Sequence, residues 1–367
     1  PADENLRLRY RFLDLRRETM HRHLHLRSRL LGYVREALTT LGFSEFQTPI
    51  LTSSSPEGAR DFLVPSRLHP GRFFALPQAP QIYKQLLMVA GFDRYFQIAP
   101  CFRDEDSRAD RSPGEFYQID LEMSFVTQDE VFAVVEQLMT GIFTTFGGGK
   151  AMTAAPFPRL TWHEARERYG TDKPDLRNPL AMIDVTDLFR GSGFQAFAGV
   201  AARADGTVRA IPVRGRGATL PRSFYDGMIA FAQGVGAKGL GYIVYADGEA
   251  RSPIANHLDA DRLQALRERC AAADGDVVFF IADSAPKARQ IAAAVLPELG
   301  SRLGLVDTDA FRFCWIVDFP MYERDEETGR IDFSHNPFSL PQGGLEALET
   351  QDPLTLLAHQ YDLVCNG

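Results

Sequence analysis

The chain has 367 residues, of which 45% are hydrophobic and 24% are charged. This composition is close to that of an average globular protein, and it excludes a disordered chain, a collagen-like repeat and a disulfide scaffold. With 40 basic and 48 acidic side chains, the formal net charge is −8. Net charge therefore gives no general attraction to nucleic acid or to an anionic membrane, and any contact with nucleic acid must be local. The length predicts about two domains.

The cysteines give no sign of a metal or redox site. Cys101, Cys270, Cys314 and Cys365 are too far apart in the sequence to form a metal-ligand or redox pair. We therefore expect a reducing, cytoplasmic location. The apolar runs are far shorter than the roughly 20 residues that span a bilayer, so we expect no membrane span. Both ends of the sequence look like cuts in a longer chain.

The first predicted elements are a helix and an edge strand. Apolar residues recur at helical spacing from residue 21 to residue 41, and Gly42 is placed to end this amphipathic helix. The next stretch, 43–51, is β-prone, and Pro49 within it suits the edge of a sheet better than its centre. We expect such an edge, beside a helix, to meet a partner.

A hairpin with a long charged tip is predicted next. Residues 81–91 have a helical pattern, residues 95–102 have the pattern of a strand, and a polar loop over 103–114 leads to a strictly alternating strand over 115–125. Because successive side chains of a strand point to opposite faces, the alternation predicts one core face and one polar face. The predicted core face holds Tyr117, Ile119, Leu121, Met123 and Phe125, and the polar face holds Phe116, Gln118, Asp120, Glu122 and Ser124.

The second half of the chain changes in texture. Residues 128–146 are helical and end at a run of glycines, Gly147–Gly149. Between Val185 and Asp307 the sequence has short strands, Gly-rich turns and two Ala-rich helices near 259–273 and 285–300, which indicates an inserted α+β domain. An apolar strand over 311–319 follows, and residues 332–338 come after a turn at 327–330.

The hairpin tip has the side chains that bind a nucleotide triphosphate. A guanidinium suits a phosphate or a carboxylate, and carboxylates suit amino groups or hydrated magnesium. The alternative is a solvated loop whose charges do nothing specific. The polar face of the following strand favours a binding site, because it would line a cleft with an aromatic ring at the entrance. The charged residues of the tip are Arg103, Arg108, Arg111, Asp104, Glu105, Asp106 and Asp110.

Several strings in a fixed order carry a family resemblance. They are the helix with Phe43-Ser-Glu-Phe-Gln-Thr-Pro-Ile-Leu51, the segments 55–66 and 76–85, Phe102-Arg-Asp-Glu-Asp106 through Glu115-Phe-Tyr-Gln-Ile-Asp120, and the segment 172–179. On these strings the chain closely resembles the bacterial-type aspartyl-tRNA synthetases, which are class II aminoacyl-tRNA synthetases. The first string is similar to class II motif 1, the homodimer element, and the hairpin is similar to motif 2. Gly217-Ala-Thr-Leu220 and Gly236-Ala-Lys-Gly239 are similar to the GAD domain that marks the bacterial form.

The resemblance implies an α+β fold, in which helices flank the antiparallel sheet of class II synthetases. Residues 1–184 would be the first part of the catalytic domain, residues 185–307 the inserted α+β GAD-like domain, and residues 308–367 a continuation of the catalytic domain that stops before motif 3. An anticodon-binding domain would be expected before the first residue.

The resemblance also implies an ATP site. Arg103, the catalytic residue, would bind the α-phosphate of ATP and the α-carboxylate of the amino acid. Asp104 and Glu105 would belong to the ATP site, and Phe116 would stack on adenine. Asp362 would be a ligand of Mg²⁺, together with a glutamate expected just past the last residue.

The implied amino-acid site binds L-aspartate through Glu57, Gln81, Lys84, Asp120 and His335, together with the arginine of the ATP site. Lys84 would face the side-chain carboxylate, and Asp120 would lie near the ammonium group or brace the lysine. Glu57 and His335 belong to loops that would close over the amino acid. The alternatives are that Gln81 and Lys84 face solvent on a helix and that His335 caps the turn that follows it.

The implied activity is that of an aspartate–tRNA ligase. It activates L-aspartate with ATP and transfers the aspartyl group to tRNA(Asp), in a homodimer formed through motif 1. Asn336 stands where many relatives have a second histidine, a variant that resembles forms that also charge tRNA(Asn). Ser112 replaces a glutamine that often contacts ATP, which puts that contact in doubt. The alternative function is a catalytically inactive synthetase-like paralogue or a binding module.

Overall fold

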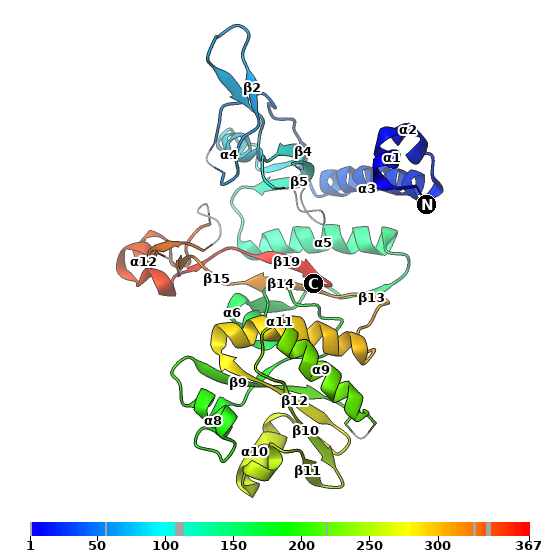
Figure 1. The fold of residues 1–367 in the computed structure, drawn as a ribbon. Helices are drawn as coiled ribbons and strands as arrows, with labels where there is room; N and C mark the ends of the chain where they lie inside the picture. The colour runs from blue at the N-terminus through cyan, green and yellow to red at the C-terminus, as the bar shows by residue number, and fades with distance from the viewer. Residues whose placement is uncertain (1, 56, 107–113, 218, 326–327, 335–338) are drawn as a thin grey trace. The chain divides into compact units, whose positions relative to one another are not determined.

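The computed structural model describes residues 2–55, 57–106, 114–217, 219–325, 328–334 and 339–367. The chain divides into two compact units, Pro1–Gly149 and Lys150–Gly367, and we describe each by itself (Figure 1). Among the described residues, no helix is both long enough and apolar enough to cross a membrane.

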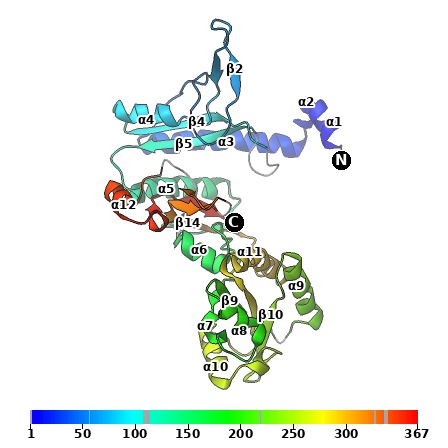
Figure 2. The ribbon, with the colours of Figure 1, turned by 60° about the vertical axis from the view of Figure 1, so that its left-hand side comes forward.

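The first unit is a small sheet packed on two long helices. Its sheet has the strand order β1-β4-β5, with β1 parallel to β4 and β4 antiparallel to β5. Figure 2 shows α3 running along this sheet. The core between the helices and the sheet includes Val34 and Leu38 of α3, Phe96 of β4 and Leu138 of α5. In chain order the elements are α1 (Glu4–Arg9), α2 (Arg11–Asp14), α3 (Glu18–Thr40), β1 (Ser44–Glu45), β2 (Leu63–Pro65), β3 (Phe73–Ala75), α4 (Gln81–Val89), β4 (Arg94–Phe102), β5 (Glu115–Met123) and α5 (Gln128–Phe146).

The predicted helices of this unit and the two strands of the predicted hairpin are confirmed, whereas most of the edge strand is not. Residues 107–113 of the charged tip lie outside the described residues. Only Ser44–Glu45 of the predicted strand 43–51 pairs as a strand. The Phe46 N–H still donates to the Phe96 carbonyl at 3.1 Å. Pro49 has no N–H to donate and restricts the residue before it, so the ladder does not continue. The chain next pairs at an isolated bridge between Thr52 and Ala75.

In the second unit, one sheet is covered by helices on both faces. Its strand order is β11-β10-β12-β9-β8. Val277, Phe279 and Ile281 of β12 pack with α9 and α11, whereas Val278 and Phe280 pack with α7, α8 and α10. The elements of this part are β8 (Ile183–Asp184), α7 (Thr186–Phe189), α8 (Gln195–Ala201), β9 (Gly206–Val213), α9 (Arg222–Gly234), β10 (Gly241–Ala246), β11 (Glu249–Arg251), η1 (Ala255–His257), α10 (Ala260–Arg269), β12 (Val277–Ser284) and α11 (Ala285–Arg302).

A second sheet of this unit joins segments that lie on either side of the predicted insertion. Strand β14 pairs in parallel with β7 and antiparallel with β19. Residues 185–307 therefore leave and re-enter one sheet; the exact boundaries of the three predicted domains remain a prediction. The elements are β6 (Ala151–Met152), β7 (Arg159–Thr161), α6 (Trp162–Tyr169), β13 (Ala310–Phe311), β14 (Phe313–Val317), β15 (Phe319–Pro320), β16 (Tyr322–Arg324), β17 (Ile331–Phe333), α12 (Gly344–Thr350), η2 (Pro353–Thr355), β18 (Leu357–Ala358) and β19 (Asp362–Cys365).

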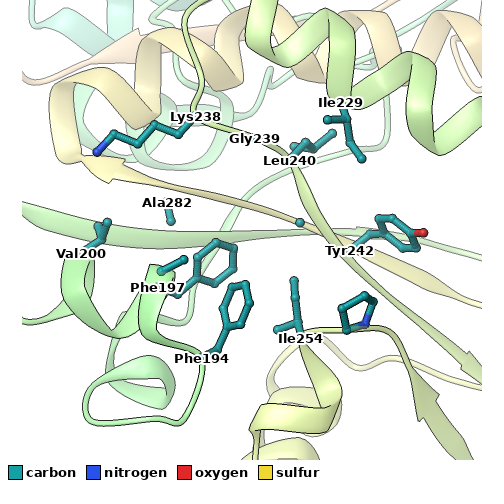
Figure 3. Close-up of a pocket in the computed structure, with 13 residues that line it drawn as sticks. Phe194, Phe197, Val200, Ile229, Lys238, Gly239, Leu240, Tyr242, Ile254 and Ala282 are labelled. Atoms are coloured by element: carbon teal, nitrogen blue, oxygen red, sulfur yellow. The ribbon is translucent and has the colours of Figure 1, made fainter.

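The sheet β11-β10-β12-β9-β8, which is covered by helices on both faces, also borders a cavity of about 510 Å³ (Figure 3). Phe194, Phe197 and Ile254 line one side of it, and Tyr242 lines another. Lys238 lies at its edge and is exposed to solvent. The lining is mainly apolar, as is usual for cavities of this size.

Candidate functional site

A lysine and two carboxylates meet over the sheet of the first unit. Lys84 of α4 places its Nζ 2.8 Å from Asp120 Oδ1 and 3.4 Å from Glu122 Oε2. The side chains of Lys84 and Asp120 are 12% and 10% exposed, so this ion pair is largely withdrawn from water. Asp120 and Glu122 are two residues apart on β5 and therefore share one face of the strand. The alternative in which Lys84 faces solvent is wrong.

The electrostatics of this ion pair keep the lysine charged. Burial lowers the pKa of Lys84, but the charges and hydrogen bonds of Asp120 and Glu122 outweigh burial, so the pKa is raised above its ordinary value. Asp120 Oδ2 is buried and has no hydrogen-bond partner among the described residues. A buried acceptor without a partner is costly, so this oxygen is suited to receive a donor from a ligand.

An arginine and an aromatic ring lie together at the base of the charged tip. Arg103 directly follows β4, and its backbone N–H donates to the Gly114 carbonyl at 2.8 Å. Its guanidinium lies over the Phe116 ring, with Cζ 5.1 Å from the centroid. Arg103 Nε is buried and has no hydrogen-bond partner among the described residues. Asp104 and Glu105, the next two residues, are exposed to solvent.

The loop that carries Glu57 adds a carboxylate near Lys84 and Arg103. Burial is the largest cause that raises the pKa of Glu57 above its ordinary value, and the charges of Arg103 and Lys84 act against it. Glu57 Oε1 accepts a hydrogen bond of 3.0 Å from the Ser55 hydroxyl. Glu57 therefore lies within the electrostatic field of both cations. Gln81 is half-buried at the start of α4, one helical turn before Lys84 and on the same side of the helix.

The comparisons with known proteins identify the family. Residues 3–367 match the model of the class II tRNA synthetases (D, K and N). The chain belongs to this family. The aspartate–tRNA(Asp/Asn) ligase of Acidiphilium cryptum (strain JF-5) is 63% identical over 364 residues, which cover 99% of this chain and 61% of that protein. The aspartate–tRNA(Asp/Asn) ligase of Gluconobacter oxydans (strain 621H) is 58% identical over 365 residues, again 99% and 61% of the two chains.

The name of a third relative does not specify which tRNAs are charged. The aspartate–tRNA ligase of Streptomyces avermitilis is 58% identical over 368 residues, which cover 100% of this chain and 61% of that protein. This class II synthetase chain thus spans 61% of the length of these curated relatives. The expected α+β fold, with helices beside an antiparallel hairpin, agrees with the family match.

Two of the predicted site residues belong to the second unit of this synthetase chain. Asp362 lies on β19 opposite Ile316, and its Oδ2 is 3.5 Å from Lys173 Nζ. The carboxylate is 39% exposed, and no group of three or more possible metal ligands occurs in the part of the chain that the structure describes. One exposed carboxylate suits Mg²⁺, which keeps several waters and phosphate oxygens as its other ligands. His335 lies outside the described residues, as do Arg108, Arg111 and Ser112.

The predicted faces of β5 are partly reversed in this synthetase chain. Leu121 and Met123 pack on the core as expected, but Tyr117 is 52% exposed, Ile119 is 38% exposed and Phe125 is 96% exposed. Leu121 and Met123 join the core with α3 and α5, whereas Tyr117 meets α3 only through the Arg27 guanidinium over its ring, and α4 contacts both β4 and β5. A single alternating strand indicates which residues share a face, but not which face another element will cover.

Three polar residues that fix the site were not among the residues predicted from the sequence. Gln78 is 2% exposed and bonds the backbone N–H and carbonyl of Ala59 at 3.0 and 2.9 Å, which fixes the loop that carries Glu57. Tyr95 and Gln97 are buried on β4, beneath the lysine. A glutamine within the otherwise apolar run 95–99 was the signal that could have drawn attention to them, because a buried polar side chain needs a partner.

Proposed function

We propose that this chain carries the amino-acid activation site of an aspartate–tRNA ligase. The observation that carries the proposal is the buried Lys84–Asp120 pair beside Arg103 and Glu57. An ammonium group has three hydrogens, and the two carboxylates beside Lys84 engage at most two of them. One hydrogen remains for a substrate carboxylate, and the unpaired Asp120 Oδ2 can accept from a substrate ammonium. L-Aspartate supplies both groups.

ATP would bind at Arg103, Asp104, Glu105 and Phe116. The α-carboxylate of aspartate attacks the α-phosphorus, a new O–P bond forms, and pyrophosphate leaves. Arg103 is placed to stabilise the charge that develops on the phosphoryl oxygens, so no protein nucleophile is required. Asp362 would hold Mg²⁺, which neutralises phosphate charge when it is bound. Because Arg103 already covers one face of the Phe116 ring, adenine stacking needs the opposite face or a movement of the guanidinium.

Exclusion of asparagine follows from the same buried lysine. Asparagine has nearly the shape of aspartate, but its side-chain amide carries no charge. A lysine that is largely withdrawn from water loses a charged partner when an amide replaces the carboxylate, and the neighbouring carboxylates cannot compensate for that loss at the same position. Electrostatic energy, rather than size, would therefore separate the two amino acids.

ATP–pyrophosphate exchange on the complete protein tests this function. We expect exchange that depends on L-aspartate and that is weaker by about 10- to 150-fold with L-asparagine, since a charged hydrogen bond contributes about 1.5–3 kcal/mol. Exchange that is absent with aspartate, from a folded protein, would overturn the proposal and favour the inactive paralogue or binding module. The named relatives are all ligases and give that alternative no support.

The second step would transfer the aspartyl group to the terminal ribose of tRNA(Asp), and we propose that tRNA(Asn) is charged as well. Two relatives with 63% and 58% identity have names that specify both tRNAs, and Asn336 follows His335 in the sequence. Aspartylation of purified tRNA(Asn) tests this second part, and the absence of any charging would refute it. The role in translation implies a cytoplasmic location.

We further propose a homodimer through the motif 1 elements. Leu24 and Leu26 of α3, in motif 1, are 47% and 40% exposed. Tyr117 and Ile119 of the motif 2 hairpin, where Arg27 of α3 lies over the Tyr117 ring, are 52% and 38% exposed. Such exposed apolar side chains are available to pack at a protein interface. Sedimentation velocity should give twice the mass of one chain, and Ile119→Glu should shift the protein towards the monomer. A monomer at micromolar concentration would contradict the dimer.

A further inference from the structure

A buried layer of polar side chains lies beneath the Lys84–Asp120 pair. In the register of β4 and β5, Tyr95 is opposite Glu122 and Gln97 is opposite Asp120. Directly opposite residues of an antiparallel pair share one face, with Cβ atoms about 5 Å apart. Tyr95 is 0% exposed and Gln97 is 5% exposed, so both lie below the ion pair rather than in the cleft.

Hydrogen bonds fix the orientation of this layer. The Tyr95 hydroxyl donates to Gln97 Oε1 at 2.8 Å, and the Thr48 hydroxyl donates to the same oxygen at 3.0 Å. Thr48 comes from the segment after β1, so the glutamine joins that segment to the floor of the site. The Tyr95 ring also stacks on Phe46, with centroids 6.2 Å apart. The phenol is therefore held in place from two sides.

The Tyr95 hydroxyl donates to Gln97 Oε1 and also interacts with the Asp120 carboxylate. Burial is the main cause that raises the pKa of Tyr95, and the charge of the nearby Asp120 carboxylate raises it further. The phenol consequently stays protonated and remains a donor. Asp120 Oδ1 accepts a hydrogen bond from Lys84 Nζ, whereas Asp120 Oδ2 has no hydrogen-bond partner among the described residues. When a substrate carboxylate shares the Lys84 ammonium, Asp120 loses part of its counter-charge. Rotation about the phenolic C–O bond can then turn the O–H towards Asp120.

We propose that Tyr95 is a positioning residue for the aspartate site. Its hydroxyl, which donates to the Gln97 Oε1 that also accepts from Thr48, sets the orientation of the Asp120 carboxylate and, through that carboxylate, the direction of the Lys84 ammonium. Tyr95 does not touch the substrate. This inference rests on the proposed function, because it names what keeps the amino-acid subsite in its binding geometry.

Tyr95→Phe removes the hydroxyl and keeps the ring, so it tests the inference directly. We expect KM for aspartate to rise about tenfold, the size expected for one hydrogen bond to a charged group, while KM for ATP stays within twofold. Tyr83→Phe is the matched control, because Tyr83 lies beside Lys84 on α4 but shares its hydrogen bond of 2.8 Å with Thr52. This control should leave both constants within twofold of the original protein.

The outcomes separate this inference from the proposed function. If the unaltered protein shows no aspartate-dependent exchange, the proposed function fails and the inference fails with it. If the unaltered protein is active and Tyr95→Phe leaves KM for aspartate unchanged, or raises the KM values for aspartate and ATP equally, only the positioning role is overturned. Should Tyr95→Phe not fold, Thr48→Val tests the same chain of hydrogen bonds. It should raise KM for aspartate about threefold without changing KM for ATP, and an unchanged value would refute the inference.

Discussion

Replacing Lys84 by methionine is the sharpest test of the site. Methionine keeps the length and flexibility of the lysine stem and removes its charge. The Lys84 side chain is 12% exposed, and its Nζ lies 2.8 Å from Asp120 Oδ1, so the charge that is removed is largely desolvated. Truncating one member of a buried, hydrogen-bonded charge pair costs about 2–5 kcal/mol. A value of about 3 kcal/mol corresponds to roughly 100-fold in kcat/KM for aspartate activation.

The assay is aspartate-dependent ATP–pyrophosphate exchange, measured beside thermal unfolding. Lys84→Met leaves the buried Asp120 carboxylate and the half-buried Glu122 carboxylate without their cation, so a lower Tm is expected, and activity is compared well below that Tm. Lys238→Met makes the same chemical change at an exposed lysine of the other unit, and it should leave exchange within twofold. The preference for aspartate over asparagine should also fall in Lys84→Met. Exchange within threefold of the unaltered protein, with the preference retained, would refute the reasoning.

Three further predictions concern stability. Burial raises the pKa of Glu57 above its ordinary 4.5, so the folded state loses stability as pH rises through the raised pKa. Glu57→Gln should therefore increase Tm at pH 7 more than at pH 4. Equal increases at the two pH values would contradict this prediction. Asp14, bound mainly by Arg7, has its pKa lowered to about 2, so its contribution is present above pH 3.8 and is lost as pH falls through about 2. Asp14→Asn should therefore speed hydrogen exchange over 11–14 at pH 6, with a smaller difference near pH 2; an equal difference at both pH values would refute the role. Gln78→Ala should lower the free energy of unfolding, measured in urea, by about 1–3 kcal/mol, because the backbone N–H and carbonyl of Ala59 lose their hydrogen bonds to the buried Gln78 amide. A change below about 0.5 kcal/mol would show that water replaces these hydrogen bonds.

The elements that carry the site could be predicted because their signals are local. The helix at 81–91 and the hairpin around the charged tip follow from periodicity, and they agree with α4, β4 and β5 to within about two residues at each end. The family resemblance then supplied the roles of Lys84 and Asp120. The contact between them, 36 residues apart in sequence, is what the structure adds.

The remaining features depend on distant parts of the chain. The Thr48–Gln97 hydrogen bond joins residues 49 apart, and nothing in either neighbourhood predicts it. Tyr117 is 52% exposed although Arg27 of α3 lies over its ring, and alternation along β5 cannot show how far another element covers a face. The strand predicted over 43–51 is too long. The prediction followed the β-propensity of these residues, whereas in the structure the hydrogen-bond donor that Pro49 lacks prevents the strand from continuing.

The uncovered apolar residues of β5 have a consequence for how the protein responds to dilution. If a second copy covers Tyr117 and Ile119, the folded state is stabilised by mass action, and each tenfold dilution below saturation removes up to about 1.4 kcal/mol. Melting would then depend on protein concentration, with Tm falling by several degrees over a hundredfold dilution. Purification and storage at low concentration would expose the same apolar side chains, so the fraction of protein lost by adsorption to surfaces should be greatest in dilute solutions.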